Sequence, residues 1–398
     1  MRDLFQRQVM TPLLVILIIQ SILTLGSYSI PVIASAAAAD FGISASAVGG
    51  AVSIVYLTAM IVGLPSGIFI ARFGAQRVFQ MILLCTATGA VLISLAHPLW
   101  ALLGAIVIGF STAPMNPAGS HVLSRVSPPR WQPLIFSIKQ CGTPAGGMLA
   151  GALLPPLIVA YGWRSALYVI PACVLCALLI SQIFGVGQKE PRRAGSGITL
   201  REVVSSLRFV WNDRLQRSHA LAGMVFAGSQ LALATYLIVY LWRELGLAPE
   251  LAGWIYATHH ISGIAARILL GFVAGKWIAT RTVLPLLAYI MAAGLVAVAL
   301  SNESWPVWVF YGVAILLGIG GNGWVGLFLS EIAILAPDGR AADTTSGNQF
   351  FMYGGIVTGP AIGSLLLGAT DSYPVLFLTI AGAVTLAGAG LSLVTRKP

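Results

Sequence analysis

Long runs of apolar residues, separated by short clusters of charged and turn-forming residues, cover most of the chain. Each run is long enough to cross a hydrocarbon core as a helix, which takes about 20 apolar residues. The pattern therefore predicts an all-α membrane protein with twelve transmembrane helices, near residues 11–38, 45–71, 77–97, 99–123, 133–160, 165–185, 219–242, 250–275, 282–300, 305–335, 344–369 and 373–394.

One long polar stretch, residues 187–217, interrupts the apolar runs and leaves six predicted spans on each side. Weak internal similarity points to two related halves, since at an offset of 209 residues Gly109 aligns with Gly318. Carriers are often built from parallel repeats of this kind. We therefore expect a six-helix bundle over residues 1–186, a linker, and a second, pseudo-symmetric six-helix bundle over residues 218–398.

Composition and charge strengthen this interpretation. Apolar residues make up 58% of the chain and charged residues 9%, against about a quarter charged in soluble domains, which excludes a soluble protein. Most of the 22 Lys and Arg residues lie in segments that would be cytoplasmic if the N-terminus were cytoplasmic. This bias predicts a multi-pass protein of a bacterial-type inner membrane with both termini in the cytoplasm. The net charge of +10 is then no sign of a nucleic-acid partner.

The hairpin GIFIARFGAQR, after the second apolar run, resembles the signature loop of the major facilitator superfamily. Gly67, Arg72, Gly74 and Arg77 match the loop, and Ala71 stands at its acidic position. The resemblance covers essentially the whole chain. It implies two six-helix bundles that transport by rocker-switch alternating access, with this hairpin as a gating loop. A tight basic turn without a gating role is the other interpretation.

Two cations lie inside predicted spans, Lys139 in the fifth and Arg267 in the eighth. Each lies about 13 Å along its helix from a basic residue at the expected cytoplasmic end. A charge in this position costs about 2.5 to 3.5 kcal/mol on insertion scales, so it calls for a reason. The resemblance places both helices beside the substrate cavity, which implies an anion site. Alternatively, both cations snorkel to the surface or bind carbonyls of neighbouring helices.

Acidic residues show the opposite distribution, because all twelve lie in loops or near span ends. Glu331, toward the end of the tenth span, is the one marginal case. Carriers of organic cations usually need a carboxylate within a span. The sequence therefore disfavours transport of organic cations.

Two histidines in the eighth span, His259 and His260, are candidates for proton coupling because histidine titrates near neutral pH. His260 lies on the same helical face as Arg267, which makes it the better candidate for a cavity residue. Hydrogen-bonded packing is the alternative for both.

Neutral polar residues within spans form a second group of candidates for substrate contact. Such groups orient a carboxylate or hydroxyl, but they also bond helix to helix. The candidates are Tyr28, Asn116, Gln140, Asn322, Asn348 and Gln349.

The sequence thus predicts a secondary active transporter, not an enzyme, for a small organic anion such as a mono- or dicarboxylate. Protons are a candidate coupling partner, the bilayer is the surroundings, and we expect a monomer. No spacing indicates a catalytic group, a cofactor or a metal site. The alternative is an exporter of neutral or amphipathic drugs and metabolites, in which both cations are structural ties between helices.

Overall fold

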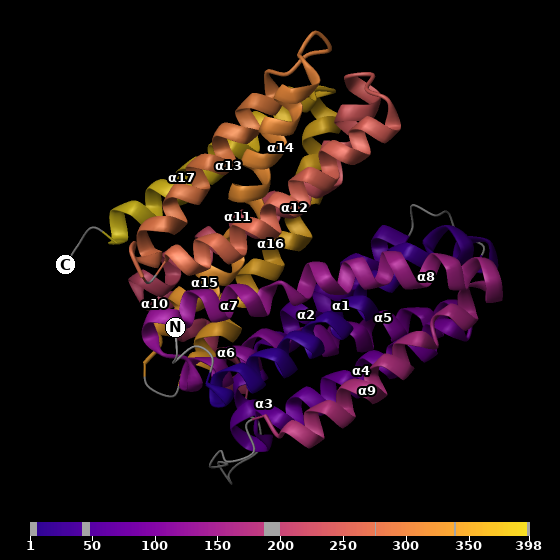
Figure 1. Cartoon of the computed structure of the whole chain (residues 1–398), viewed down its shortest axis with the longest axis vertical. Coiled ribbons are helices and arrows are strands. Elements are labelled where there is room, and N and C mark those ends of the chain that lie inside the picture. Colours follow the sequence, from indigo (N-terminus) through magenta and orange to yellow (C-terminus); the bar gives the residue numbers. More distant parts are fainter. Residues whose placement is uncertain (1–5, 42–47, 187–199, 275, 338–339, 396–398) are drawn as a thin grey trace. The chain divides into compact units, whose positions relative to one another are not determined.

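The computed structural model describes residues 6–41, 48–186, 200–274, 276–337 and 340–395. Within these ranges the chain is almost entirely helical, and its β pairing is limited to an isolated bridge between Ala274 and Ile278 (Figure 1). The predicted all-α class is confirmed.

Helices follow one another with short connections along both halves of the chain. In the first half they are α1 (Arg7–Phe41), α2 (Val48–Gly63), α3 (Ser66–Phe73), α4 (Ala75–Ser94), α5 (Pro98–Thr112), α6 (Met115–Val126), η2 (Pro129–Trp131), α7 (Gln132–Gln140), α8 (Gly142–Ala166) and α9 (Val169–Phe184). In the second half they are α10 (Leu200–Asn212), α11 (Arg214–Val239), η3 (Tyr240–Glu244), α12 (Pro249–Val273), α13 (Thr280–Ala299), α14 (Val307–Asn322), α15 (Trp324–Ile334), α16 (Ala341–Thr370) and α17 (Tyr373–Thr395).

Four predicted spans are pairs of helices rather than continuous rods. The second is α2 followed by α3, with a bend of 60° beside Pro65, and the fourth is α5 followed by α6 beside Pro114. Proline removes a backbone donor and clashes with the preceding turn, which explains these two breaks. The fifth span breaks at Cys141 and the tenth at Gly323. Each break leaves carbonyl or N–H groups without a helical partner.

Nine helices in the described part of the chain are long and apolar enough to cross a membrane, and the bent pair α2 and α3 gives a tenth. The other two predicted spans coincide with α9, a shorter apolar helix, and with α12. Helix α12 carries three polar side chains, His259, His260 and Arg267.

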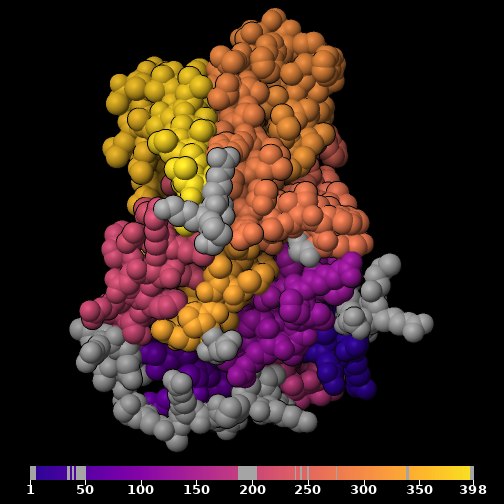
Figure 2. Space-filling model, turned by 90° about the vertical axis from the view of Figure 1, so that its left-hand side faces the viewer, coloured from indigo at the N-terminus to yellow at the C-terminus, as the bar shows by residue number. Residues whose placement is uncertain are grey.

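The chain divides into two compact units. Unit 1 holds Met1–Pro128, Ile138–Phe209 and Ala336–Phe350, and unit 2 holds Pro129–Ser137, Val210–Leu335 and Phe351–Pro398. Within unit 1, α1 packs along α8, and α4 lies between α5 and α9 (Figure 1). Within unit 2, α12 packs on α14, and α13 packs on α17. In Figure 2, α13 is orange and α17 is yellow, and the two colours lie side by side. The predicted division at residues 187–217 stays a prediction.

A helix, α10, occupies part of the predicted linker. Near its end Trp211 stacks on Phe351 with ring centroids 5.9 Å apart, and the Arg217 guanidinium lies 5.8 Å from the Trp211 ring centroid. The stretch is polar on average and was predicted as a linker, although its apolar residues Leu200, Val203, Val204 and Leu207 recur at a helical spacing. The remainder of the predicted linker, residues 187–199, lies outside the described residues.

Candidate functional site

In unit 1, the helix breaks of the fourth and fifth spans place three polar side chains together. Asn116 lies in the first turn of α6, directly after the break beside Pro114. Lys139 and Gln140 end α7, directly before the break at Cys141.

Lys139 is buried, with 1% of its surface exposed. Its Nζ donates hydrogen bonds to Asn116 Oδ1 and, over 2.9 Å, to Gln140 Oε1. Both acceptors are neutral amide oxygens, so within the described part of the chain the ammonium group is solvated by amides. The approach is close: a Cβ on Gly119 of α6 would lie 3.2 Å from Lys139 Cε.

In unit 2, Arg267 of α12 is also buried, at 6% exposure. Its Nε donates to the backbone carbonyl of Asn322 over 2.7 Å. That carbonyl belongs to the last residue of α14, where the break at Gly323 leaves it outside the helical hydrogen-bond ladder. The sequence alternative of a cation bound to a helix carbonyl therefore describes this contact of Arg267.

The Asn322 side chain links two further helices. Its Oδ1 accepts from Gln230 Nε2 of α11 over 2.6 Å, and its Nδ2 lies 3.0 Å from His259 Nε2 of α12. His259 is 1% exposed, and its Nδ1 has no hydrogen-bond partner in the described residues. Asn322 thus joins α11, α12 and, through its carbonyl, Arg267.

His260 lies next to this network without joining it. Its exposed ring packs edge-on against Tyr256 with centroids 4.7 Å apart, and it lies 5.0 Å from the His259 ring centroid. The Tyr256 hydroxyl donates to the Ala234 carbonyl over 3.1 Å. The sequence favoured His260 over His259, whereas the hydrogen bonds of the structure connect His259 to Asn322.

The remaining predicted contacts are dispersed. Tyr28 on α1 is half-exposed and lies against α8, where a Cβ on Gly147 would be 3.0 Å from its ring. Asn348 and Gln349 on α16 are fully buried, and Asn348 Nδ2 donates to the Thr344 carbonyl over 2.9 Å. Their grouping with Lys139 or Arg267 stays a prediction.

The predicted gating loop, residues 67–77, covers nearly all of α3 and the start of α4. Gly74 between them has φ of 82°, a conformation that favours glycine. Arg72 and Arg77 are exposed, and Gly67 is buried against Asp343 at the start of α16. An acid therefore does contact this loop, although it comes from another helix than the signature predicts.

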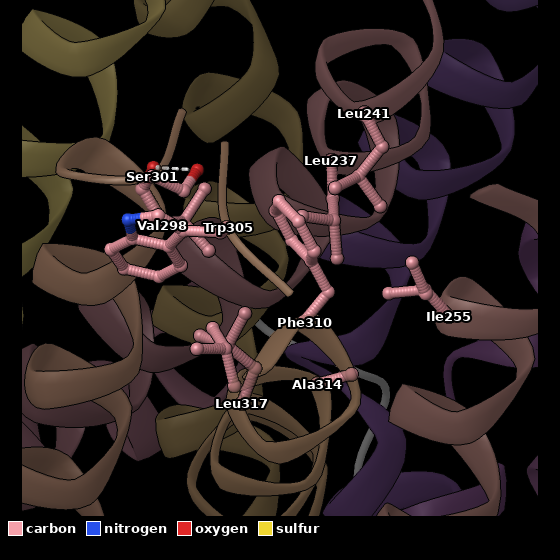
Figure 3. Close-up of a pocket in the computed structure, with 10 residues that line it drawn as sticks. Leu237, Leu241, Ile255, Val298, Ser301, Trp305, Phe310, Ala314 and Leu317 are labelled. Atoms are coloured by element: carbon pink, nitrogen blue, oxygen red, sulfur yellow. Dashed lines mark hydrogen bonds between the residues drawn. The ribbon is translucent and has the colours of Figure 1, made fainter. Parts of the chain in front are cut away.

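Unit 2 also holds an apolar pocket, drawn in Figure 3, which is lined chiefly by Leu237, Leu241, Ile255, Val298, Phe310 and Leu317. The one hydroxyl drawn there, Ser301 Oγ, donates to the Val298 carbonyl over 2.7 Å. The drawn residues carry no charge, and their polar side-chain groups are the Ser301 hydroxyl and the Trp305 indole N–H. We therefore place the candidate site at the buried cations instead.

Sequence reasoning gave two residues too little weight. Gln230 was one of several polar residues in the seventh span, and nothing in its surroundings marked it as the partner of Asn322. Asp343 was counted as an end-of-span acid, and its contact with Gly67 depends on tertiary packing. Asn322 lies 92 residues from Gln230, and Gly67 lies farther still from Asp343, so local patterns reach neither pair.

Broken helices with buried polar groups at the breaks, within an all-helical bundle of membrane-spanning length, define a multi-pass membrane carrier. The sequence profile of the Major Facilitator Superfamily matches residues 16–360. The chain belongs to this family of transporters.

Similar proteins agree with this assignment. The 4-hydroxybenzoate transporter PcaK of Acinetobacter baylyi is 25% identical over 383 residues, which covers 86% of this chain and 81% of PcaK. A structure of a bacterial homologue of the iron transporter ferroportin in the outward-facing state has a TM-score of 0.80 at 16% identity, covering 98% of this chain and 100% of that one. The human organic anion transporter MFSD10 has a TM-score of 0.76 at 15% identity, covering 97% and 99%. The likeness to both structures concerns the fold.

Proposed function

We propose that this transporter moves a small organic anion, a mono- or dicarboxylate, by rocker-switch alternating access. Arg267 and Lys139 supply the positive charge that the anion binds. Asn322, Asn116 and Gln140 hold the two cations in place, and Tyr28, Asn348 and Gln349 contribute to substrate orientation.

The observation that carries the proposal is the way in which Lys139 is held. Within the described residues, its hydrogen bonds go to two neutral amide oxygens. Arg267 donates through Nε to a neutral carbonyl oxygen. A buried cation is costly unless something offsets its charge, and an anionic substrate does so.

The similarity to a 4-hydroxybenzoate transporter supports an aromatic carboxylate as the first substrate to test. Tyr256, His259 and His260 form a cluster of rings on the same helix as Arg267. Rings of this kind stack on an aromatic substrate while a nearby cation binds its carboxylate.

The other parts of the proposal concern cellular context. We place the protein in an inner membrane as a monomer, with both termini in the cytoplasm, because most basic residues then lie on the cytoplasmic side. The hairpin with Gly67, Arg72, Gly74 and Arg77 serves as the gating loop. Transport is coupled to protons as symport.

One observation favours a second candidate, an exporter of neutral or amphipathic compounds. The bond from Arg267 to the Asn322 carbonyl is also what a structural tie between α12 and α14 would form. In that case the charge of the substrate would not matter.

The two candidates differ in how transport responds to substrate charge. Purified protein in proteoliposomes is tested for uptake of labelled 4-hydroxybenzoate and of 4-hydroxybenzamide, its neutral analogue. We expect saturable uptake of the acid and none of the amide. Each cation is then replaced in turn, as Lys139→Met and Arg267→Met, with Arg164→Met at an exposed position as the control.

Loss of uptake in the variants of Lys139 and Arg267, with uptake retained in the Arg164 variant, is the result that the proposal predicts. Unimpaired uptake in both Lys139→Met and Arg267→Met would contradict the site assignment. Equal transport of acid and amide would favour the exporter.

A further inference from the structure

Three side chains of unit 2 form an ordered chain of hydrogen bonds that runs from a buried ring to a half-buried amide. His259 is buried on α12, Asn322 is buried at the end of α14, and Gln230 is half-buried on α11. Gln230 Nε2 donates to Asn322 Oδ1, and the Asn322 amide nitrogen faces His259 Nε2. Each bond constrains the direction of the next.

This hydrogen-bond chain fixes the tautomer of His259. Because the Asn322 oxygen is engaged with Gln230, its NH₂ group points to His259 and must donate. His259 Nε2 therefore accepts, and a neutral ring carries its proton on Nδ1. That Nδ1 is the buried nitrogen without a partner in the described residues.

A second proton on His259 reverses every bond of the chain. Protonated Nε2 is a donor and faces the donor NH₂ of Asn322, so the Asn322 carboxamide must turn to present its oxygen. Its NH₂ group then faces Gln230, which must turn in the same way and accept through Oε1. Each turned amide exchanges its oxygen and nitrogen and otherwise keeps its place, since the two atoms occupy nearly equal positions.

We propose that the chain of His259, Asn322 and Gln230 couples proton binding to anion binding by reversing the polarity of the Gln230 amide. With His259 neutral, Gln230 Nε2 donates to Asn322. Gln230 Oε1 is then the outer end of the hydrogen-bond chain, and this oxygen repels a carboxylate. With His259 protonated, Oε1 is engaged and the NH₂ group is turned outward, where it donates to a carboxylate. This rests on the proposed function and gives His259, rather than His260, the coupling role.

The surroundings of His259 leave few other titratable groups. Helices α11, α14, α15 and η3 pack on α12. On α11 the Tyr236 hydroxyl donates to the Pro360 carbonyl, and on η3 the Tyr240 hydroxyl donates to the Val298 carbonyl. On α12 itself Tyr256 and His260 present their rings to His259.

Among the described residues, the charged groups on these helices include Arg267, which binds the Asn322 backbone carbonyl, Glu244 on η3 and Glu331 on α15. The Arg267 contact is to the carbonyl of the peptide and does not constrain the turning of the side-chain amide.

The test measures binding of 4-hydroxybenzoate to purified protein at about pH 5 and about pH 8, a range over which its carboxylate stays mostly ionised. Wild type should bind about tenfold more weakly at the higher pH, as loss of one bond to a charged group predicts. It should also take up protons on binding. His259→Gln and Gln230→Met should bind with equal affinity at both pH values and take up none.

Two further variants sharpen the result. His219→Gln, on α11 of the same unit, replaces a buried histidine that contacts the Leu215 carbonyl and should keep the pH dependence. His260→Gln should keep it as well. Persistence of the pH dependence in His259→Gln, or its loss in His260→Gln alone, would overturn the inference.

A second measurement needs no ligand and separates failure of this inference from failure of the proposed function. Nitrogen-15 NMR of labelled histidine reads the tautomer of neutral His259 directly. From the hydrogen-bond chain we expect a proton on His259 Nδ1 in wild type and a mixture of His259 tautomers in Gln230→Met. A proton on Nε2 in wild type would overturn the inference, whereas absence of 4-hydroxybenzoate binding at either pH would count against that substrate alone.

Discussion

The two buried cations have similar hydrogen-bond partners, but the further contacts of those partners differ. Lys139 and Arg267 each bind an asparagine that stands next to a helix break, Asn116 and Asn322 respectively. Lys139 uses side-chain oxygens only, from Asn116 and Gln140. Arg267 uses a backbone carbonyl, which leaves the side chain of Asn322 available to other helices.

That difference separates two kinds of site. The Lys139 ammonium group binds two side-chain amide oxygens, which hold its charge in place. The Asn322 group continues through His259 and Gln230, so a change in protonation at one end reaches the other. A backbone carbonyl freed by a helix break is the physical reason why one asparagine can serve two purposes.

The largest effect on stability should come from Asn116→Leu. It removes one of two acceptors from a buried ammonium group, and leaving a buried charge poorly solvated costs about 3 kcal/mol or more. Unfolding of the purified protein in mixed micelles measures the loss. Adding Lys139→Met to this variant should restore much of the stability. A variant as stable as wild type would show that Lys139 needs no support from Asn116.

Two glycines test how tightly each group is packed. A Cβ on Gly263 would collide with Asn322 Cβ, an atom close to the backbone, so Gly263→Ala should destabilise by about 1 to 3 kcal/mol. A Cβ on Gly119 would meet Lys139 Cε at 3.2 Å, near the end of a flexible side chain, so Gly119→Ala should cost much less. Unfolding in the same micelles compares the two. The reverse order would mean that the Lys139 site is the more rigid.

Asn322→Leu should cost less stability than Asn116→Leu, about 1 to 2 kcal/mol, since it removes neutral hydrogen bonds and keeps the carbonyl that binds Arg267. The variant should lose a larger fraction of its uptake than of its free energy of unfolding, because the connection between His259 and Gln230 is lost. Uptake and unfolding measured on the same preparation show the contrast. A loss of stability greater than that of Asn116→Leu would reverse the ranking of the two sites.

The smallest effect should come from the exposed ion pair of Arg164 and Asp40, because water screens the attraction between the two charges. Hydrogen bonds from the Arg164 guanidinium and from the Trp163 indole, each 3.0 Å long, hold the pKa of Asp40 below its ordinary value. A lowered carboxyl pKa adds stability above the unfolded-state value of about 4, and this is lost as pH falls through the folded value.

Arg164→Gln should therefore be slightly less stable than wild type at neutral pH and equally stable in acid. Unfolding midpoints measured across this pH range check the sign. A difference that grows as the pH falls would contradict the assignment to Asp40.

The sequence predicted the spans and the buried cations well because both leave strong local signals. Twenty apolar residues in a row, or a lone Lys139 among them, can be recognised without a structure. The helix at Leu200–Asn212 was missed because its low average hydrophobicity pointed to a linker, although its apolar residues recur at a helical spacing. Gln230 and Asp343 could not be ranked, because their importance lies in contacts with residues far away along the chain.

For Arg267 the sequence left two interpretations open, and the structure shows a contact that belongs to one of them. Its depth in the eighth span indicated an anion site or a bond to a helix carbonyl, and its Nε does bond to the Asn322 carbonyl. The guanidinium has more than one donor, so this bond and an anion site are compatible. Only a helix break, which the sequence did not reveal, makes that carbonyl available.

The central claim is tested most directly by the affinity of purified protein for 4-hydroxybenzoate in wild type, Arg267→Lys and Arg267→Met. The account predicts that Arg267→Met binds about 100-fold more weakly, in line with loss of a charge-assisted bond worth up to about 3 kcal/mol, while Arg267→Lys keeps part of the affinity. Wild-type affinity in Arg267→Met would contradict it.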